Sequence, residues 1–121
     1  MSSNSSSSEP VIDAEAIENL RAINPDDSSF LKEIIGIFIE DTPARIAELR
    51  AAMTSGDVTA FSRAAHSIKG SSSNLGAARL RAQAERLEHD SKTQPLASFA
   101  QSIAELEATF AATKSALEQL E

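Results

Sequence analysis

One histidine, His66, lies in a stretch whose residue types suit a reaction at the protein surface. On a helical wheel, Phe61, Ala64, Ile68 and Leu75 fall on one side, and His66 lies at the centre of the opposite side. Two cations and three small residues lie within about 60° of His66 on that wheel, namely Arg63, Lys69, Ser62, Gly70 and Ser73. This pattern predicts an exposed imidazole, flanked by positive charge and free of bulky neighbours on one side.

Phosphoryl transfer is the chemistry that such an imidazole suits. A neutral imidazole nitrogen is a nucleophile near neutral pH, because histidine titrates near pH 6.5. Lys69 and Arg63 could offset the negative charge of a transferred group. Gly70 costs up to about 1 kcal/mol in a helix interior relative to alanine, so its presence there needs a reason. Gly70 and Ser73 would let a partner's active site approach closely. The alternative is an ordinary exposed histidine.

Other catalytic or metal-binding arrangements find little support in the sequence. His89 and Glu85 are spaced as half of a metal site, but no further ligand joins them, so a solvated surface histidine is the favoured interpretation. A histidine-based hydrolase would need a clustered acid, a metal or oxyanion donors, which are not evident. The sequence has no glycine-rich phosphate loop, so we expect neither ATP binding nor autokinase activity. The chain has no cysteine, which excludes disulfides and thiolate metal sites.

Composition limits the class of partner. Eleven basic and eighteen acidic side chains give a net charge of −7, which argues against nucleic acid. The longest apolar run, residues 34–39, is too short to cross a membrane, and no secretory signal is present. We therefore expect a cytoplasmic protein, and we also expect a monomer. Residues 57–92 carry six basic and four acidic side chains, and this basic island favours an acidic partner or anion, or is ordinary surface scatter.

The elements that must position His66 are all predicted to be helices. We expect residues 1–10 to be a disordered serine-rich tail and residues 11–121 to be one helical domain. Asp13 is predicted to cap the first, short helix, and Asp57 the helix that runs to about Asn74. Thr42-Pro43 is predicted to end one helix and start the next. The expected helices after the first are 28–41, 43–55, 57–74, 77–91 and 95–120.

The fold class that follows is all-α, an antiparallel four-helix bundle with an additional short N-terminal helix. No segment alternates apolar and polar residues over the length of a strand. The long apolar stripe after residue 28 predicts a deeply buried helix. All five phenylalanines are expected in the core: Phe30, Phe38, Phe61, Phe99 and Phe110. The last helix keeps apolar 3,4 spacing, with a polar gap at Thr113 and Lys114.

The sequence around His66 resembles the histidine-containing phosphotransfer (HPt) domains of multistep two-component signalling. That family's core pattern is Ala-His-x-hydrophobic-Lys-Gly-small-small-x-x-hydrophobic-Gly-Ala, and residues 65–77 fill every fixed position. Residues 38–43, Gly56-Asp57 and Leu87-Glu88 are similar to the residues that frame the motif in this family. The resemblance covers about residues 11–112, and the helix beyond Ala112 has no functional explanation from it.

The resemblance implies a relay of phosphoryl groups between the aspartates of receiver domains, which belong to response regulators or hybrid histidine kinases. His66 would be the phosphoacceptor, Lys69 would stabilise the phosphoryl group, and Gly70 would permit docking. Ser62, Arg63 and Ser73 would complete the docking face. No cofactor is expected on this chain, and Mg²⁺ is expected on the receiver. A non-phosphorylated helical adaptor that binds receivers is the alternative function.

The family also implies a partner for the second ring nitrogen of His66. Its members often anchor that nitrogen with a polar side chain from the next helix. Glu85, Glu88 and Asp90 are the candidates here. The sequence does not distinguish between them.

Overall fold

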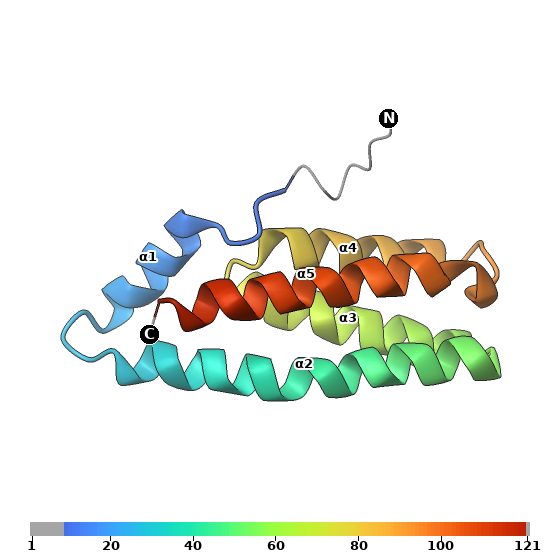
Figure 1. The fold of residues 1–121 in the computed structure, drawn as a ribbon, viewed down its shortest axis with the longest axis horizontal. Helices are drawn as coiled ribbons and strands as arrows, with labels where there is room; N and C mark the ends of the chain where they lie inside the picture. The colour runs from blue at the N-terminus through green and yellow to red at the C-terminus, as the bar shows by residue number, and fades with distance from the viewer. Residues whose placement is uncertain (1–8, 121) are drawn as a thin grey trace.

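A computed structural model describes residues 9–120, and all regular structure in this part of the chain is helical (Figure 1). The elements are α1 (Ala14–Ile23), α2 (Ser29–Ser55), α3 (Val58–Asn74), α4 (Ala78–Asp90), the 3₁₀ helix η2 (Leu96–Phe99) and α5 (Ala100–Glu118). Helix α3 packs between α2 and α4, and α5 also contacts both α2 and α4, which closes the bundle. This arrangement confirms the predicted antiparallel four-helix bundle with a short N-terminal helix.

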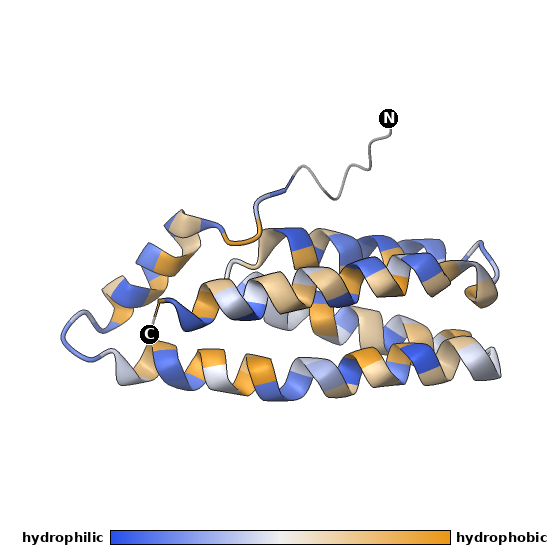
Figure 2. Ribbon diagram, viewed as in Figure 1, coloured by the Kyte–Doolittle hydropathy of each residue, from blue (hydrophilic) through white to orange (hydrophobic). Residues whose placement is uncertain are grey.

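The core lies along the bundle axis and draws on every helix. Hydrophobic and hydrophilic residues alternate along the helices (Figure 2), as amphipathic helices require. The largest side chains with almost no exposed surface include Ile35 and Leu49 of α2, Phe61 and Ile68 of α3, Leu80 of α4, and Ile103, Leu106 and Leu117 of α5. Phe61 and Ile68 belong to the face that the sequence placed opposite His66. Their burial fixes the rotation of α3 and turns His66 outward.

Helix α2 is continuous through Pro43, so the predicted break at Thr42-Pro43 is wrong. Proline lacks the N–H that an interior helical residue donates, which is why the sequence favoured a helix start there. The buried residues of α2 instead keep 3,4 spacing on both sides of the proline, from Leu31 to Ala52. Burial of this continuous stripe outweighs the lost hydrogen bond, and Pro43 lies on the exposed face.

The start of α2 is less buried than the sequence predicts. Phe30 is 37% exposed and therefore lies outside the core, whereas the other four phenylalanines are buried or partly buried. Ile23, the last residue of α1, is also exposed. Both residues lie beside the connection between α1 and α2, where few elements are available to cover them.

The last predicted helix begins differently from expectation. Residues 96–99 form the 3₁₀ helix η2, and the α-helix starts only at Ala100. Thr113, predicted to lie in a polar gap, is buried, and its hydroxyl donates a hydrogen bond to the Thr109 carbonyl at 2.7 Å. Because that bond satisfies the hydroxyl locally, the threonine can occupy a core position. Leu117, one turn further on, is fully buried.

Helix α1 and the turn between α3 and α4 hold each other in place. Asp13 caps α1 by accepting a hydrogen bond from the Glu15 N–H, as predicted. The Asp13 N–H in turn donates to the Gly76 carbonyl at 2.7 Å. Gly76 has a φ of 68°, and a Cβ at this position would lie 2.5 Å from the Ala16 Cβ. Glycine is therefore required in this turn both for its backbone conformation and for the approach of α1.

Residues 9 and 10, assigned from the sequence to the tail, are held against α4. The carbonyl of Glu9 accepts a hydrogen bond from the Arg79 Nε, and the carbonyl of Pro10 accepts one from the Arg79 N–H. The rest of the predicted tail, residues 1–8, lies outside the described residues. None of the described helices combines the length and apolarity needed to cross a membrane.

Candidate functional site

The imidazole of His66 projects from the middle of α3, and 66% of its side chain is exposed. This agrees with the helical-wheel prediction. The predicted neighbours are also at the surface: Arg63, Gly70 and Ser73 are exposed, and Ser62 is partly buried. A Cβ added to Gly70 would meet no atom within 4 Å. The packing of this chain therefore does not require glycine at position 70, and the open space is available to a partner.

Glu88 of α4 binds the inner nitrogen of the imidazole. Its Oε2 lies 3.0 Å from the His66 Nδ1. An ionised carboxylate can only accept hydrogen bonds, so Nδ1 carries the proton of the neutral ring. The other nitrogen, Nε2, then keeps its lone pair. Of the three acids that the sequence left open, Glu88 is therefore the one that contacts the ring. Glu85 pairs with Arg81, and Asp90 pairs with Arg86.

The same carboxylate also binds Lys69. The Lys69 Nζ lies 2.9 Å from the Glu88 Oε1, and 28% of the lysine side chain is exposed. Glu88 thus bridges the imidazole and the ammonium group, each through one carboxylate oxygen. Sequence reasoning placed Lys69 beside His66 but gave no sign of this contact, because it depends on the register between α3 and α4.

The charge state of Glu88 follows from these contacts. Partial burial alone would raise its pKa, but the hydrogen bonds from Lys69 and His66 outweigh burial, and the pKa of Glu88 lies below its ordinary value. Glu88 is therefore ionised at neutral pH, as the acceptor role at Nδ1 requires.

The other candidates from the sequence do not join this site. His89 is exposed in the last turn of α4. Within residues 9–120, no three histidine or acidic side chains are grouped so as to hold a metal ion. The exposure of His89 agrees with its interpretation as a solvated surface histidine.

Comparison with known proteins identifies the family. The model of the Hpt domain matches residues 33–120, which is most of the chain. The chain belongs to the Hpt family. Hpt domains act by histidine phosphotransfer in phosphorelays, and they exchange phosphoryl groups with receiver domains, including those of hybrid kinases. The Hpt match extends to residue 120, just beyond the end of α5, whereas the resemblance seen in the sequence ends at about residue 112.

Two solved structures are similar to this Hpt domain. Histidine-containing phosphotransfer protein B from Pseudomonas aeruginosa PAO1 is 29% identical, with a TM-score of 0.82, over 91% of this chain and 93% of that chain. The HPT domain of the Hpt sensor hybrid histidine kinase from Shewanella is 18% identical, with a TM-score of 0.71, over 91% and 92% of the two chains. The second likeness supports the fold alone. No curated protein sequence matches this chain.

Proposed function

We propose that His66 is the phosphoacceptor of this Hpt domain and reacts through Nε2. The observation that carries the proposal is the contact between His66 Nδ1 and Glu88, because it places the ring proton on the inner nitrogen of an exposed imidazole. The nucleophilic lone pair is then on the outer nitrogen, on the side where Gly70 leaves open space.

The transfer step needs no proton movement on this chain. The Nε2 lone pair attacks the phosphorus of a receiver's aspartyl phosphate, the N–P bond forms, the acyl P–O bond breaks, and the aspartate carboxylate leaves. The ring keeps its Nδ1 proton and becomes positively charged beside the Glu88 carboxylate. Reversal of these steps passes the phosphoryl group to another receiver. We propose that Mg²⁺, where it is needed, is held by the receiver and that this chain neither binds ATP nor phosphorylates itself.

Lys69 has the role of stabilising the phosphoryl group in this proposal. It lies three residues after His66 on the same face of α3, which places their Cβ atoms about 5–6 Å apart. An ammonium group has three N–H donors, so Lys69 can hold Glu88 with one and still donate to a phosphoryl oxygen. Ser62, Arg63, Gly70 and Ser73 form the receiver-docking face around His66. The monomeric state, the cytoplasmic location and the absence of nucleic acid binding remain predictions.

The decisive experiment is incubation with a receiver domain phosphorylated on its aspartate, in the presence of Mg²⁺, followed by intact-mass measurement. We expect one acid-labile, base-stable phosphoryl group per chain. His66→Gln should accept none and keep its fold, because the side chain is exposed. His89→Gln is the matched control and should be labelled like the wild type. Full labelling of His66→Gln would contradict the assignment, and a wild-type chain that binds receivers without labelling would be an adaptor.

A further inference from the structure

The two cations beside His66 differ in their contacts with the rest of the chain. Arg63 and Lys69 lie three residues before and after the histidine on α3, so each is a neighbour of the imidazole on the helix surface. Lys69 is bound to Glu88. Arg63 is exposed and makes no hydrogen bond or ion pair with any residue of the described part of the chain.

Arg63 is unusual among the arginines, all of which lie within residues 9–120. The other six side chains each have a partner: Arg21 pairs with Glu18, Arg45 with Asp41 and Glu48, Arg50 with Glu107, Arg79 with the Glu9 carbonyl, Arg81 with Glu85, and Arg86 with Asp90. The arginine without a partner in this part of the structure is therefore the one beside the proposed phosphoacceptor.

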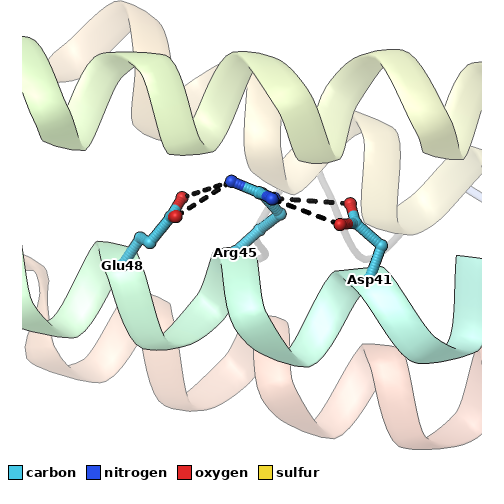
Figure 3. A network of polar contacts seen from close by, with 3 residues as sticks. All are labelled: Asp41, Arg45 and Glu48. Carbon is cyan, nitrogen blue, oxygen red and sulfur yellow. Dashed lines mark hydrogen bonds and ion pairs between the residues drawn. The ribbon is translucent and has the colours of Figure 1, made fainter.

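The residues around Arg63 leave its guanidinium available to bind an anion from a partner. It lies with Ser67 along a shallow groove between α3 and α2, whose α2 side carries Arg45 and Glu48. Figure 3 shows the Arg45 guanidinium between Asp41 and Glu48. Its Nη1 donates to the two Glu48 oxygens at 2.8 and 2.9 Å. Asp57, which also lines the groove, accepts a hydrogen bond from the Ala60 N–H. Glu48 and Asp57, the two acids that line the groove, thus already have other partners.

We propose that Arg63 is the residue that captures the phosphorylated receiver, whereas Lys69 acts on the phosphoryl group once it has reached His66. The ligand of Arg63 is the aspartyl phosphate of the receiver, whose oxygens a guanidinium can bind in pairs. Arg63 can direct all of its N–H donors at an incoming anion, whereas Lys69 shares its donors with Glu88. The inference rests on the proposed function, since it assumes that the receiver's phosphoryl group approaches His66.

The proposal predicts which kinetic step each cation controls. Long-range attraction raises the association rate and weakens with salt, so Arg63 should determine the association rate and its salt dependence. Lys69 should determine the lifetime of phosphohistidine. If Arg63 only supported the fold, replacing it would not reduce the association rate and its salt dependence while leaving the phosphohistidine lifetime unchanged.

The test measures association of the full chain with a receiver that exchanges phosphoryl groups with the wild type, loaded with Mg²⁺ and beryllofluoride as the phosphoryl mimic. At low salt, Arg63→Gln should slow association about three- to tenfold and flatten its dependence on salt. Arg63→Lys should recover the salt dependence but only part of the rate. Lys114→Gln on α5 removes the same charge from an exposed site and should change the rate less than twofold.

The phosphohistidine lifetime completes the test and separates the two proposals. Arg63→Gln should leave this lifetime within twofold of wild type. If the variant associates at the wild-type rate with the wild-type salt dependence, or shortens the lifetime as much as Lys69→Ala does, the role of Arg63 is refuted while His66 stands. If the wild-type chain is not phosphorylated at His66, both proposals are refuted. A melting temperature equal to wild type will show that each variant is folded.

Discussion

At the scale of single residues, the site depends on one carboxylate with two partners. Glu88 holds the Nδ1 proton of His66 through one oxygen and the ammonium group of Lys69 through the other. His66, Lys69 and their places on one helix face could be predicted, because helical periodicity is a local property of the sequence. Glu88 could not be selected from Glu85 and Asp90, because the choice depends on how α4 is positioned against α3.

Lys69→Ala should slow phosphoryl transfer to His66 about tenfold and shorten the phosphohistidine lifetime. The physical reason is the loss of an ammonium group beside the transferred anion. Lys69→Arg should retain part of both effects, because the charge remains but its geometry changes. Single-turnover transfer from a phosphorylated receiver at two salt concentrations measures the rates. Equal rates in all three proteins would remove Lys69 from the site.

Glu88 should also make stability depend on pH. Its pKa in the folded chain is lowered below the ordinary value of 4.5. A lowered folded pKa means that Glu88 stabilises the fold above its unfolded pKa and that this contribution is lost as the pH falls through the folded pKa. Glu88→Gln should therefore lower the free energy of unfolding at pH 7, by at most about 1 kcal/mol for a partly exposed group.

Urea denaturation at several pH values measures the effect of Glu88→Gln. The difference from wild type should disappear once the pH has fallen through the lowered folded pKa, because Glu88 is then protonated in both the folded and the unfolded chain. Glu85→Gln is the control, because Glu85 lies on the same helix but is more exposed and pairs with Arg81. A difference between Glu88→Gln and wild type that stays constant down to low pH would show that the lost contribution is not ionic.

At the scale of elements, capping residues and prolines predict where helices begin and end, except where tertiary packing overrides them. The caps of α1 and α3 were predicted because Asp13 and Asp57 act on N–H groups within the next three residues. Thr42-Pro43 was misread because a proline in the first turn and a proline within a helix look alike in sequence. The buried stripe that continues past Pro43 shows that this proline lies within a helix.

Pro43→Ala should raise the free energy of unfolding by roughly 1–3 kcal/mol. Alanine restores the N–H that can donate to the carbonyl four residues earlier and removes the ring's clash with that carbonyl. Pro43 is exposed, so no core packing is lost. Urea denaturation measures the change, and Glu40→Ala, an exposed substitution in the same helix, should shift stability by no more than about 0.5 kcal/mol. A destabilised Pro43→Ala chain would contradict this account of α2.

Substitutions at Gly70 and Gly36 can distinguish two effects, the loss of open space for a partner and the change in helix stability. Both are helical, and a Cβ at either position would meet no atom within 4 Å. Glutamine at either position should leave the chain folded and slightly more stable, since glycine is the poorer helix former. Only Gly70→Gln should block phosphoryl transfer from a receiver, because position 70 lies one turn from His66. If Gly70→Gln accepts phosphoryl groups at the wild-type rate, the open space beside His66 has no role in docking.

At the scale of the whole molecule, the end of α5 closes the bundle beside the start of α2. The role of this segment could not be read from the sequence, because the apolar repeat is interrupted at Thr113. In the structure Thr113 and Leu117 are both buried, and Leu120 packs against the core. The segment beyond Ala112 is therefore part of the core, which agrees with the extent of the Hpt match.

Leu117→Ala should lower the free energy of unfolding by about 2–5 kcal/mol, the usual cost of removing a fully buried leucine side chain. His66 projects from the middle of α3, and Leu117 is not part of the site around it. The variant should therefore accept phosphoryl groups from a receiver at the wild-type rate at temperatures where it is folded. Urea denaturation and single-turnover transfer, measured on the same preparation, test both expectations. Slower transfer by a fully folded Leu117→Ala chain would show that the end of α5 acts on the site as well as on the stability of the bundle.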